Sequence, residues 1–546
     1  MYSFDSKIRP QWLLYGSFIW ISGSSAAPFS SDQVVLTAQD GAGAVASENM
    51  ECSRIGRDLL RLGGNAIDAM VGTQLCVGVT SMYHSGIGGG GFALVRTADG
   101  EYETIDFRET APAAATQDMY NDDVHASIEG GLAVGVPSEL RGLEYMHEKW
   151  GDLAWESVVM PASHLAREGF SVTADMVRYM VAGMKDAGRD FLIDEPSWAE
   201  VFAPNGTLLG EGDTMYRTRL ADTLTTVAKK GASAFYTGDL AASFVKTVRD
   251  ADGIMTLEDL TAYRAEIREP LSTTFRNHTL YTTGAPASGA ITLNMLKTME
   301  QYPLPPTPAT NLTMHRYNEA MRFAYGARSL LGDPDFASLL DNATAAHTRA
   351  RILDNETQPV GRYAPHALFV PDTHGTSHVV TADSAGRAVS LTSTVNLLFG
   401  ALLVDPRTGV VLNNEMNDFS IPGVRNAFGF EPSPANFIRP GKRSLSSITP
   451  VIVEAPDGAL RAVVGAAGGS RIAVAEPRLH DQLMPNEVWL EYTFNNETAA
   501  SLAEKGHRVK WVREGLSAVQ GITVLGSGKF EAASEPRQKN SGGLTA

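Results

Sequence analysis

The sequence predicts an α+β fold, in which helical and strand-forming stretches occupy separate parts of one long chain. Residues 130–260 show the apolar spacing and loop signals of a mainly helical region. Residues 375–419 instead alternate apolar and polar residues through what we interpret as four short strands. No Pro/Ser-rich or charged linker divides the 546 residues, so we expect one globular unit.

The first 27 residues have the order of a signal peptide. Basic Lys7 and Arg9 precede an apolar run over 12–21, and small residues follow to Ala27. The apolar run is about half of the ~20 residues that span a bilayer, so we expect cleavage near Ala26 or Ala27. A signal-anchor that stays in place is the alternative.

Six glycosylation sequons support entry into the secretory pathway. They begin at Asn205, Asn277, Asn311, Asn342, Asn355 and Asn496. We therefore expect an extracellular or vacuolar protein. The net charge of −17 argues against a nucleic-acid partner, because binding a phosphate backbone requires clustered Lys and Arg.

The two cysteines, Cys52 and Cys76, lie in a predicted helical hairpin. Residues 43–62 and 66–78 are interpreted as helices joined by a Gly-Gly-Asn turn, and the cysteines lie at similar distances from that turn. In an antiparallel hairpin they would face each other, so we expect a disulfide in an oxidising compartment. Two buried free thiols are the alternative.

Residues 86–91, GIGGGG, contain the letters of a dinucleotide-binding motif but lack its context. An alternating stretch with a turn at Asp99-Gly100 follows, which predicts a hairpin where the motif requires a helix. We interpret the glycines as sites of tight turns or close backbone approach. At the end of the hairpin, Arg108 could hold a carboxylate in a bidentate fork, although spacing alone favours an ordinary ion pair.

The chain between the helical region and the strand-rich stretch changes character twice. Residues 261–283 are interpreted as strands, and 287–302 and 312–331 as helices. Prolines and glycines over 359–375 predict an accessible loop. The last dozen residues are polar, and we expect them to be disordered.

The stretch after Gly375 places two threonines opposite each other. A hairpin turning at 383–387 has its midpoint at Ala385, nine residues from both Thr376 and Thr394. Directly opposed positions have Cβ atoms about 5 Å apart, so one hydroxyl can orient the other. Asn396 lies on the same face as Thr394. A second hairpin, turning at 405–409, is expected to bring the acidic, amide-rich run 413–418 alongside.

A threonine hydroxyl needs a base to become a nucleophile. The role of the flanking histidines, His374 and His378, is open. A free α-amine has a pKa of about 8 and can act as the base, which requires cleavage of the Gly375–Thr376 bond. Downstream, Ser446-Ser447 and the run GAAGG at 465–469 form a second cluster. Such glycines can build an oxyanion hole, although the run taken alone is a weak signal.

Together these motifs resemble the γ-glutamyltransferases, or glutathione hydrolases, of the N-terminal-nucleophile hydrolase superfamily. The matching phrases are CSRIGRDLLRLGGNAIDAMVGTQLCVG (52–78), GIGGGGF (86–92), DFRETAP (106–112), GGLAVGVPSELRG (130–142), FAYGARSLLGDPDF (323–336), TSH (376–378), TSTVN (392–396), NNEMNDFS (413–420), PSPANFIRPGKRSLSS (432–447) and VVGAAGG (463–469). They cover nearly the whole chain in order.

The resemblance implies a four-layer αββα sandwich, built from a precursor that cuts itself. A large subunit, 28–375, would follow the signal peptide 1–27, and a small subunit, 376–546, would begin at its nucleophile and remain attached as a heterodimer. The residue roles it implies are Thr376 as nucleophile with Thr394 as partner; Gly468 and Gly469 as oxyanion donors; Arg108, Ser446 and Ser447 for the substrate α-carboxylate; Asn396, Glu415 and Asp418 for its α-amine; Phe428 on a lid; and a Cys52–Cys76 disulfide.

The implied activity is transfer of a γ-glutamyl group from glutathione and related compounds to water, an amino acid or a dipeptide, without cofactor or metal. The chain departs from the family pattern at Asn417, where the family has Asp; the retained Asp418 is the expected ligand. Two alternatives are a relative that cleaves another amide, such as a cephalosporin acylase, and an inactive binding or structural homologue.

Overall fold

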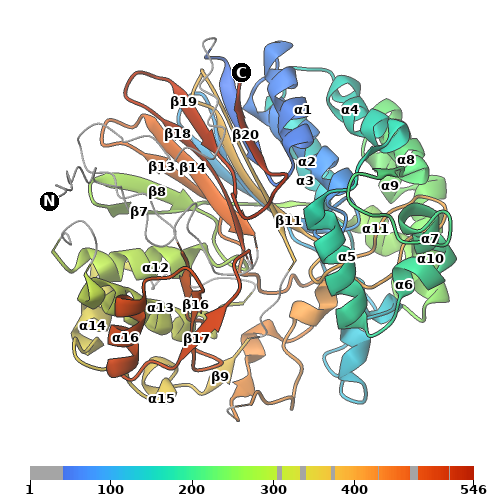
Figure 1. The fold of residues 1–546 in the computed structure, drawn as a ribbon. Helices are drawn as coiled ribbons and strands as arrows, with labels where there is room; N and C mark the ends of the chain where they lie inside the picture. Colours follow the sequence, from blue (N-terminus) through green and yellow to red (C-terminus); the bar gives the residue numbers. More distant parts are fainter. Residues whose placement is uncertain are drawn as a thin grey trace, which may run out of the picture.

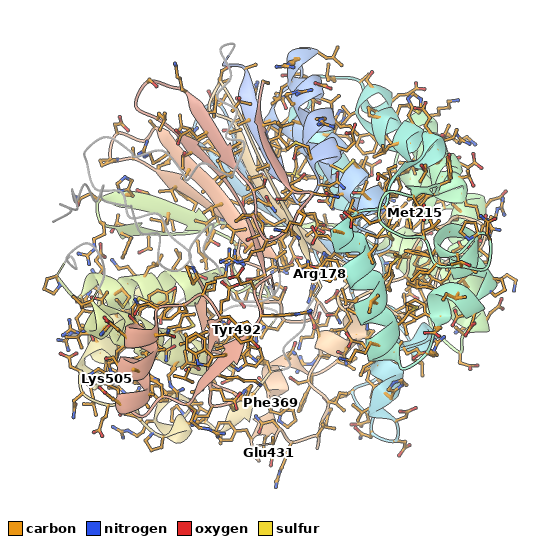
Figure 2. The ribbon with its side chains drawn as sticks, in the orientation of Figure 1. Arg178, Met215, Phe369, Glu431, Tyr492 and Lys505 are labelled. Atoms are coloured by element: carbon orange, nitrogen blue, oxygen red, sulfur yellow. A yellow bond between two sulfur atoms is a disulfide. The ribbon has the colours of Figure 1, made fainter. Side chains whose placement is uncertain are left out.

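A computed structural model describes residues 41–303, 310–332, 340–370, 375–427, 429–467, 477–515 and 517–546. Two antiparallel sheets face each other, and helices cover both outer faces (Figure 1). This arrangement is the predicted αββα sandwich. Side chains fill the space between its layers (Figure 2).

Strands from both ends and the middle of the chain form the first sheet. In the described part of the chain its order is β20-β1-β10-β11-β2-β3-β6. The bounds are β1 Gly43–Ser47, β2 Gly90–Arg96, β3 Tyr102–Phe107, β6 Glu266–Arg268, β10 Ser377–Asp383, β11 Ala388–Thr394 and β20 Gly542–Thr545. The β2–β3 pair confirms the hairpin after the glycine run. A Cβ on Gly89 or Gly91 would lie 2.0 Å from a backbone oxygen of β11, which explains these glycines.

The second sheet packs its inner face on the first. Its order is β19-β18-β14-β13-β8-β7 among the described residues. The bounds are β7 Leu271–Phe275, β8 His278–Thr282, β13 Val451–Glu454, β14 Leu460–Ala467, β18 Ala518–Val524 and β19 Phe530–Ala533. Val380 and Ala382 of β10 pack against Ile452, Val463 and Ile522 to form the core between the sheets.

The helical hairpin covers the outer face of the first sheet. Helices α1 (Met50–Arg61) and α2 (Ala66–Thr80) are joined by the predicted turn, where Asn65 and Asp68 form a capping box. The Cys52–Cys76 disulfide is present, with an S–S distance of 2.07 Å. The predicted helix over 43–62 is wrong at its start, because residues 43–47 form β1 and pair with β10 and β20.

The helices that follow the hairpin confirm the helical character of residues 130–260. They are α3 Glu139–Trp150, α4 Trp155–Glu168, α5 Ala174–Ala187, α6 Phe191–Asp194, α7 Pro196–Phe202, α8 Thr218–Lys230, α9 Ser233–Tyr236, α10 Gly238–Asp250 and α11 Leu257–Ala262. The short strands β4 (Phe170–Ser171) and β5 (Thr214–Met215) interrupt them.

A second helical group covers the outer face of the second sheet (Figure 1). It comprises α12 Gly289–Glu300, α13 Asn311–Arg328, α14 Asn342–Arg351, α15 Val360–Tyr363 and α16 Asn496–Glu504, with the strands β9 Leu368–Phe369, β12 Glu431–Pro432, β15 Leu479–His480, β16 Val488–Glu491 and β17 Val509–Val512. The predicted loop over 359–375 therefore contains a short helix and a strand. The predicted disorder of the last dozen residues is wrong, because β20 pairs with β1.

The predicted signal peptide lies outside the described residues. Within the described ranges, no helix has the length and apolar character needed to cross a membrane. The asparagines of all six sequons are exposed, which leaves each open to a glycan.

Candidate active site

The two threonines meet at the open end of the β10–β11 pair. Ser377 pairs with Ser393, so continuing the ladder by one residue places Thr376 opposite Thr394, as the symmetric hairpin predicted. The Thr394 hydroxyl donates a hydrogen bond to the carbonyl oxygen of Gly375 and accepts one from the Asn396 N–H, at 2.7 Å. Thr394 therefore polarises the carbonyl of the Gly375–Thr376 bond.

Gly375 occupies a position that only glycine fits. Its φ is +143°, and a Cβ there would lie 2.3 Å from the backbone oxygen of Asn396. An L-residue would be strained in this region and would push the carbonyl away from Thr394. The glycine before Thr376 is thus required by the local backbone.

The acidic run lies beside the threonines, and a short irregular hairpin precedes it. The predicted hairpin turning at 405–409 is present: Asp405 N–H donates to Val410 O, Leu412 N–H donates to Leu403 O, and Val404 forms an antiparallel bridge with Val411. Asn414 connects the segments, since its N–H donates to Val395 O and its side-chain oxygen accepts from Leu397 N–H. Residues 415–418 then form a short 3₁₀ helix.

Arg108, Glu415 and Asp418 form a buried ion cluster. Arg108 follows β3, and its Nη2 lies 2.6 Å from Glu415 Oε1 and also contacts Asp418. Burial alone would lower the pKa of Arg108, but the two acids hold it above its ordinary value. Burial also raises the pKa of Glu415, and the charge of Arg108 opposes this only in part. The fold therefore unites the three residues from both sides of the Gly375–Thr376 bond.

Several acceptors in this cluster lack a donor within the described part of the chain. They are Asn396 Oδ1, Asp418 Oδ1 and Glu415 Oε2, whereas Glu415 Oε1 has its ion pair with Arg108. Asn396 has a φ of +74°, and its amide nitrogen is engaged by Asn414 O at 2.9 Å. Buried acceptors without donors are costly, and an alkylammonium group could supply three N–H bonds at once.

Ser446 and Ser447 lie on a segment tied to Asp418. The Asn436 side chain donates to Asp418 O at 2.7 Å and accepts from Leu445 N–H at 2.9 Å. The Ser447 hydroxyl accepts from Arg328 Nη2 at 2.9 Å. Arg328 also lines a cavity of about 260 Å³ that continues toward Phe369 and Met484. The segment that carries the serine pair is thus tied through Asn436 to the backbone of Asp418.

Three expected site residues, Gly468, Gly469 and Phe428, lie outside the described residues. The chain that follows Phe428 is tied to the segment before Gly375, since β12 pairs in parallel with β9. Glu431 and Phe369 lie near each other at this junction (Figure 2). The rims of the expected lid and of the expected cleavage segment therefore contact each other.

His378 lies between the two sheets, and His374 lies outside the described residues. The Nδ1 of His378 is 2.8 Å from the Thr392 hydroxyl, and its Nε2 is 3.3 Å from the Ser390 hydroxyl. A Cβ on Gly465 would lie 2.2 Å from the ring, so that glycine makes room for it. Burial lowers the pKa of His378 to about 3, which indicates a neutral structural imidazole.

Two acidic or amide residues near the ion cluster, Asn417 and Glu109, were not given a role by the sequence. The Asn417 amide donates to the Ser127 hydroxyl at 2.8 Å, so it secures the loop and does not face Arg108. Glu109 is buried, and neither of its oxygens has a donor among the described residues. Burial raises its pKa to about 8 against the charge of Arg108. Its position next to Arg108 was the one signal available for it.

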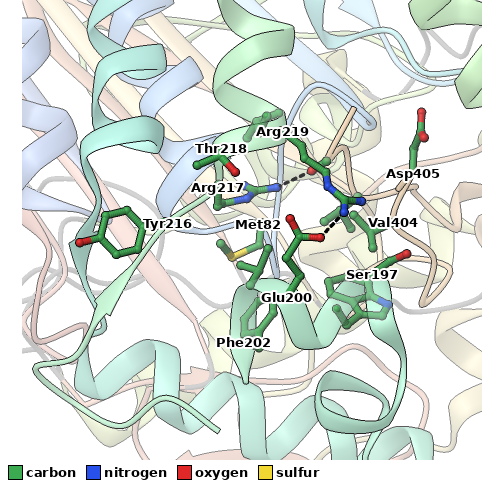
Figure 3. Close-up of a pocket in the computed structure, with 15 residues that line it drawn as sticks. Met82, Ser197, Glu200, Phe202, Tyr216, Arg217, Thr218, Arg219, Val404 and Asp405 are labelled. Atoms are coloured by element: carbon green, nitrogen blue, oxygen red, sulfur yellow. Dashed lines mark hydrogen bonds and ion pairs between the residues drawn. The ribbon is translucent and has the colours of Figure 1, made fainter. Parts of the chain in front are cut away.

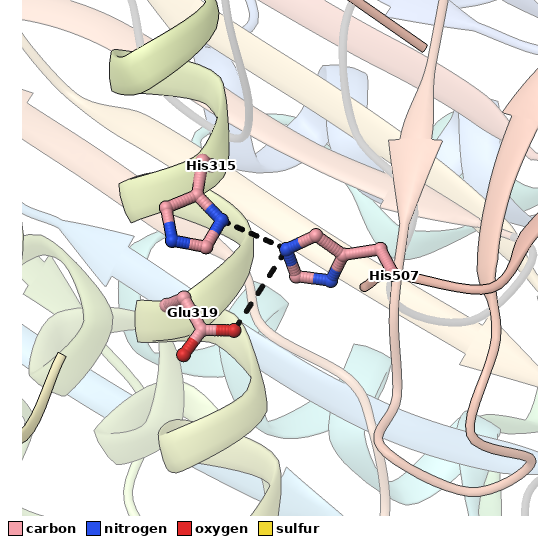
Figure 4. Close-up of side chains that lie close together, drawn as sticks. All are labelled: His315, Glu319 and His507. Atoms are coloured by element: carbon pink, nitrogen blue, oxygen red, sulfur yellow. Dashed lines mark hydrogen bonds and ion pairs between the residues drawn. The ribbon is translucent and has the colours of Figure 1, made fainter. Parts of the chain in front are cut away.

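One group of potential metal ligands occurs elsewhere among the described residues. His315, Glu319 and His507 lie together between α13 and the turn before β17 (Figure 4). His315 Nε2–H donates to Leu353 O, so its Nδ1 must accept from His507 Nε2–H at 2.8 Å. Two nitrogens on a tetrahedral Zn²⁺ lie about 3.3 Å apart. The geometry therefore favours a chain of neutral hydrogen bonds.

Another cavity, of about 90 Å³, lies between α7, α8 and the 404–411 loop (Figure 3). The buried Arg217 beside it donates to Gly78 O and Val79 O at the end of α2, and to Gly409 O. Burial lowers the pKa of Arg217 to about 9. Its bonds satisfy the helix end and the loop, so its role is structural.

Comparisons with known proteins give matches over most of the chain. A family model described as gamma-glutamyltranspeptidase matches residues 52–473 and 471–544. The glutathione hydrolase proenzyme of Arthroderma benhamiae is 45% identical over 575 residues, which cover 97% of each chain. The glutathione hydrolase of Aspergillus flavus is 44% identical, with coverage of 92% of this chain and 89% of the relative.

Solved structures show the same fold. A cephalosporin acylase from Bacillus halodurans superimposes with a TM-score of 0.82 at 24% identity, covering 97% of this chain and 99% of that one. The gamma-glutamyltranspeptidase of Helicobacter pylori is 31% identical, with a TM-score of 0.55 over 61% of this chain and 96% of that one.

Proposed function

The chain belongs to the γ-glutamyltranspeptidase family, and on that premise we propose that it is a glutathione hydrolase whose nucleophile is Thr376. It cleaves the γ-glutamyl amide of glutathione and related compounds. The acyl group passes through an ester on Thr376 to water, an amino acid or a dipeptide.

The observation that carries the proposal is the buried set of charges around Arg108. A γ-glutamyl group has a carboxylate and an ammonium on one carbon. The carboxylate complements Arg108, with Ser446 and Ser447 beside it, and the ammonium complements the acceptors of Asn396, Glu415 and Asp418 that have no donor among the described residues. Binding this zwitterion replaces the Arg108–acid contacts by two new charge pairs and supplies the missing donors.

The chemistry then follows at the threonine pair. Once the chain is cut, the α-amine of Thr376 takes the hydroxyl proton, and Oγ attacks the side-chain carbonyl of the donor. Thr394 positions that hydroxyl, and Gly468 and Gly469 supply oxyanion donors. Expulsion of the amine, Cys-Gly in the case of glutathione, leaves the ester. Water or an acceptor amine attacks the ester and restores Thr376.

We assign residues 28–375 and 376–546 to the two subunits, after a signal peptide over 1–27. The sheet order supports their staying together: β10 and β11 follow the cut but lie between β1 and β2, which precede it. Separation of the subunits would break both strand ladders. We place the protein in the secretory pathway, outside the cell or in a vacuole, with the signal-anchored form as the alternative.

The test is a pair of substitutions at the nucleophile. Thr376→Ala removes the hydroxyl, and we expect a single uncut chain that releases no chromophore from a γ-glutamyl anilide. Thr376→Ser keeps a hydroxyl and should retain both reactions at a reduced rate. Edman sequencing of the smaller wild-type chain should read Thr-Ser-His. Normal turnover by the alanine variant would disprove the assignment of the nucleophile.

A second assay separates this function from that of a relative that cleaves other amides. We expect rapid release of amine from the γ-glutamyl anilide and at least a ~10²-fold lower kcat/KM for the matching glutaryl anilide. The glutaryl compound lacks the α-ammonium and leaves the buried acceptors unpaired. Equal rates would favour the acylase alternative, and no turnover of either would favour the binding homologue.

A further inference from the structure

Strands β10 and β11, which carry the two threonines at their ends, are each hydrogen-bonded to a buried carboxylate on the helical side of the sheet. Ser377 follows Thr376, Ser393 precedes Thr394, and the two serines are directly paired in the ladder. Because side chains alternate along a strand, the serines point away from the second sheet and toward the helical layer. Ser377 donates a hydrogen bond to Glu48, and Ser393 donates one to Glu139.

Glu48 connects the end of β10 to three other segments. The residue follows β1 and is 6% exposed. One of its oxygens accepts from Ser377, and the other accepts from Gln538 Nε2 at 3.0 Å and lies 3.2 Å from His84 Nδ1. The backbone oxygen of His84 in turn accepts from Val395 N–H at 2.9 Å. Glu48 therefore holds Ser377 relative to the residue that follows Thr394.

Glu139 performs the matching task for β11. It is the first residue of α3 and is fully buried. The same oxygen accepts from Ser393 and from Gln74 Nε2, the latter at 2.9 Å, while its other oxygen has no donor in the described ranges. Its backbone N–H donates to Gly89 O at 3.0 Å. The carboxyl group thus connects β11 to α2, and the backbone N–H of Glu139 connects the start of α3 to the glycine-rich loop.

Burying the carboxyl groups of Glu48 and Glu139 lowers the stability of the fold. Neither carboxylate has a Lys or Arg ion pair among the described residues, and a buried carboxyl without a cation is unfavourable. Burial raises the pKa of Glu139 to about 7. The charge of Glu139 in turn contributes to the raised pKa of the nearby Glu109, of which burial is the main cause. An apolar residue would pack here at lower cost.

We propose that Glu48 and Glu139 are positioning residues, which hold Ser377 and Ser393 so that Thr376 and Thr394 keep the geometry needed for self-cleavage and acyl transfer. The proposal rests on the proposed function of the two threonines. It assigns neither carboxylate a contact with substrate. Because both hydrogen bonds act on strand ends, their loss should shift the reacting atoms without changing the charges around Arg108.

The test compares Ser393→Ala and Glu139→Leu with Glu139→Gln and with a control on the same rear face, Thr381→Val. The Thr381 hydroxyl is buried and donates to Ala66 O at 2.7 Å, but it lies away from the strand end. The measurements are the half-time of self-cleavage, kcat and KM for a γ-glutamyl anilide, and the thermal unfolding temperature of each purified protein.

We expect Ser393→Ala and Glu139→Leu to slow cleavage and to lower kcat about tenfold or more, with KM within about twofold of the wild-type value, since small misplacements mainly affect the reacting atoms. Glu139→Gln still presents an acceptor to Ser393 and should restore both rates. Thr381→Val should lower the unfolding temperature with little change in kcat.

Ser377→Ala is measured in the same way for Glu48. Unchanged kcat in Ser393→Ala would overturn the role of Glu139, and unchanged kcat in Ser377→Ala would overturn that of Glu48; an equal loss of kcat in Thr381→Val would overturn both. Ser393→Ala removes one oxygen atom, so it remains decisive where Glu139→Leu fails to fold. A wild-type protein that does not turn over the anilide refutes the proposed function. An active wild type with an unaffected Ser393→Ala variant refutes only the positioning role of Glu139.

Discussion

Gly375→Ala tests the cleavage site without touching the nucleophile. The added Cβ would lie 2.3 Å from Asn396 O, whereas real contacts of this kind do not fall below 3.0 Å. The backbone must therefore move by about 0.7 Å, the difference between these two distances. In addition, an alanine at a φ of +143° has a backbone strain of about 1–3 kcal/mol. The Gly375 carbonyl oxygen would then lose its hydrogen bond from the Thr394 hydroxyl.

A displacement of this size lowers the rate of a positioned reaction by about 10²-fold, equivalent to about 2.7 kcal/mol of barrier. The assay follows conversion of the single chain into two bands after purification, with N-terminal sequencing of the smaller band. Gly361→Ala is the matched control, since a Cβ there meets no atom within 4 Å. Cleavage of Gly375→Ala at the wild-type rate would refute the account of the scissile bond.

Three further perturbations follow from the structure. Replacing Cys52 and Cys76 by alanine opens a loop with a sequence separation of 24 and should lower the free energy of unfolding by ~3 kcal/mol, measured by urea denaturation; an unchanged midpoint would contradict this. Burial depresses the pKa of His507 and His378 to about 3, so the unfolded chain binds more protons between pH 3 and 6.5. Stability should therefore fall by ~1.4 kcal/mol per pH unit per histidine as pH drops through this window, and His507→Gln should remove one share of that slope; parallel curves would argue against it. Arg108→Lys keeps the charge but loses the planar fork, so kcat/KM should fall ~10²-fold while self-cleavage continues, and a loss of cleavage would place Arg108 in processing instead.

The register of the threonine pair could be predicted because it is local. Asp383 sets the turn, since its side chain accepts from the N–H groups of Ala385 and Arg387, and everything else follows by counting. The contacts of the acidic run after the second hairpin could not be predicted in the same way. The Asn413 side chain donates to Gly88 O and Gly135 O, which lie far away in the sequence.

The errors at the two ends of the chain have one common cause. Residues 43–47 are small and apolar, which suits a helix or a strand, and the polar C-terminus carries no strong strand signal. Each becomes a strand because the other is its neighbour: Val45 pairs with Leu544, and Ser47 with Gly542. A contact over about 500 residues leaves no trace in local periodicity.

The residues of the ion cluster could be predicted from sequence motifs, but the partner of Arg108 could not. Spacing favoured an ion pair for Arg108, and the family resemblance favoured a substrate carboxylate. The structure shows the ion pair, because Glu415 and Asp418 contact Arg108, and the substrate carboxylate stays a proposal. Buried charges of one sign would be too costly to hold without a ligand, so the site neutralises itself.

This arrangement affects how substrates are selected. A ligand with only a carboxylate would have to displace the acids from Arg108 and leave them unpaired in a buried site, at a cost of several kcal/mol. A ligand with only an ammonium would compete with Arg108 for the same acids. A zwitterion on a single carbon can do both at once, because its two charges separate Arg108 from Glu415 and Asp418 and pair with each. Under the proposed function, discrimination against singly charged amides therefore follows from the ion cluster itself, before the Thr376 hydroxyl takes part.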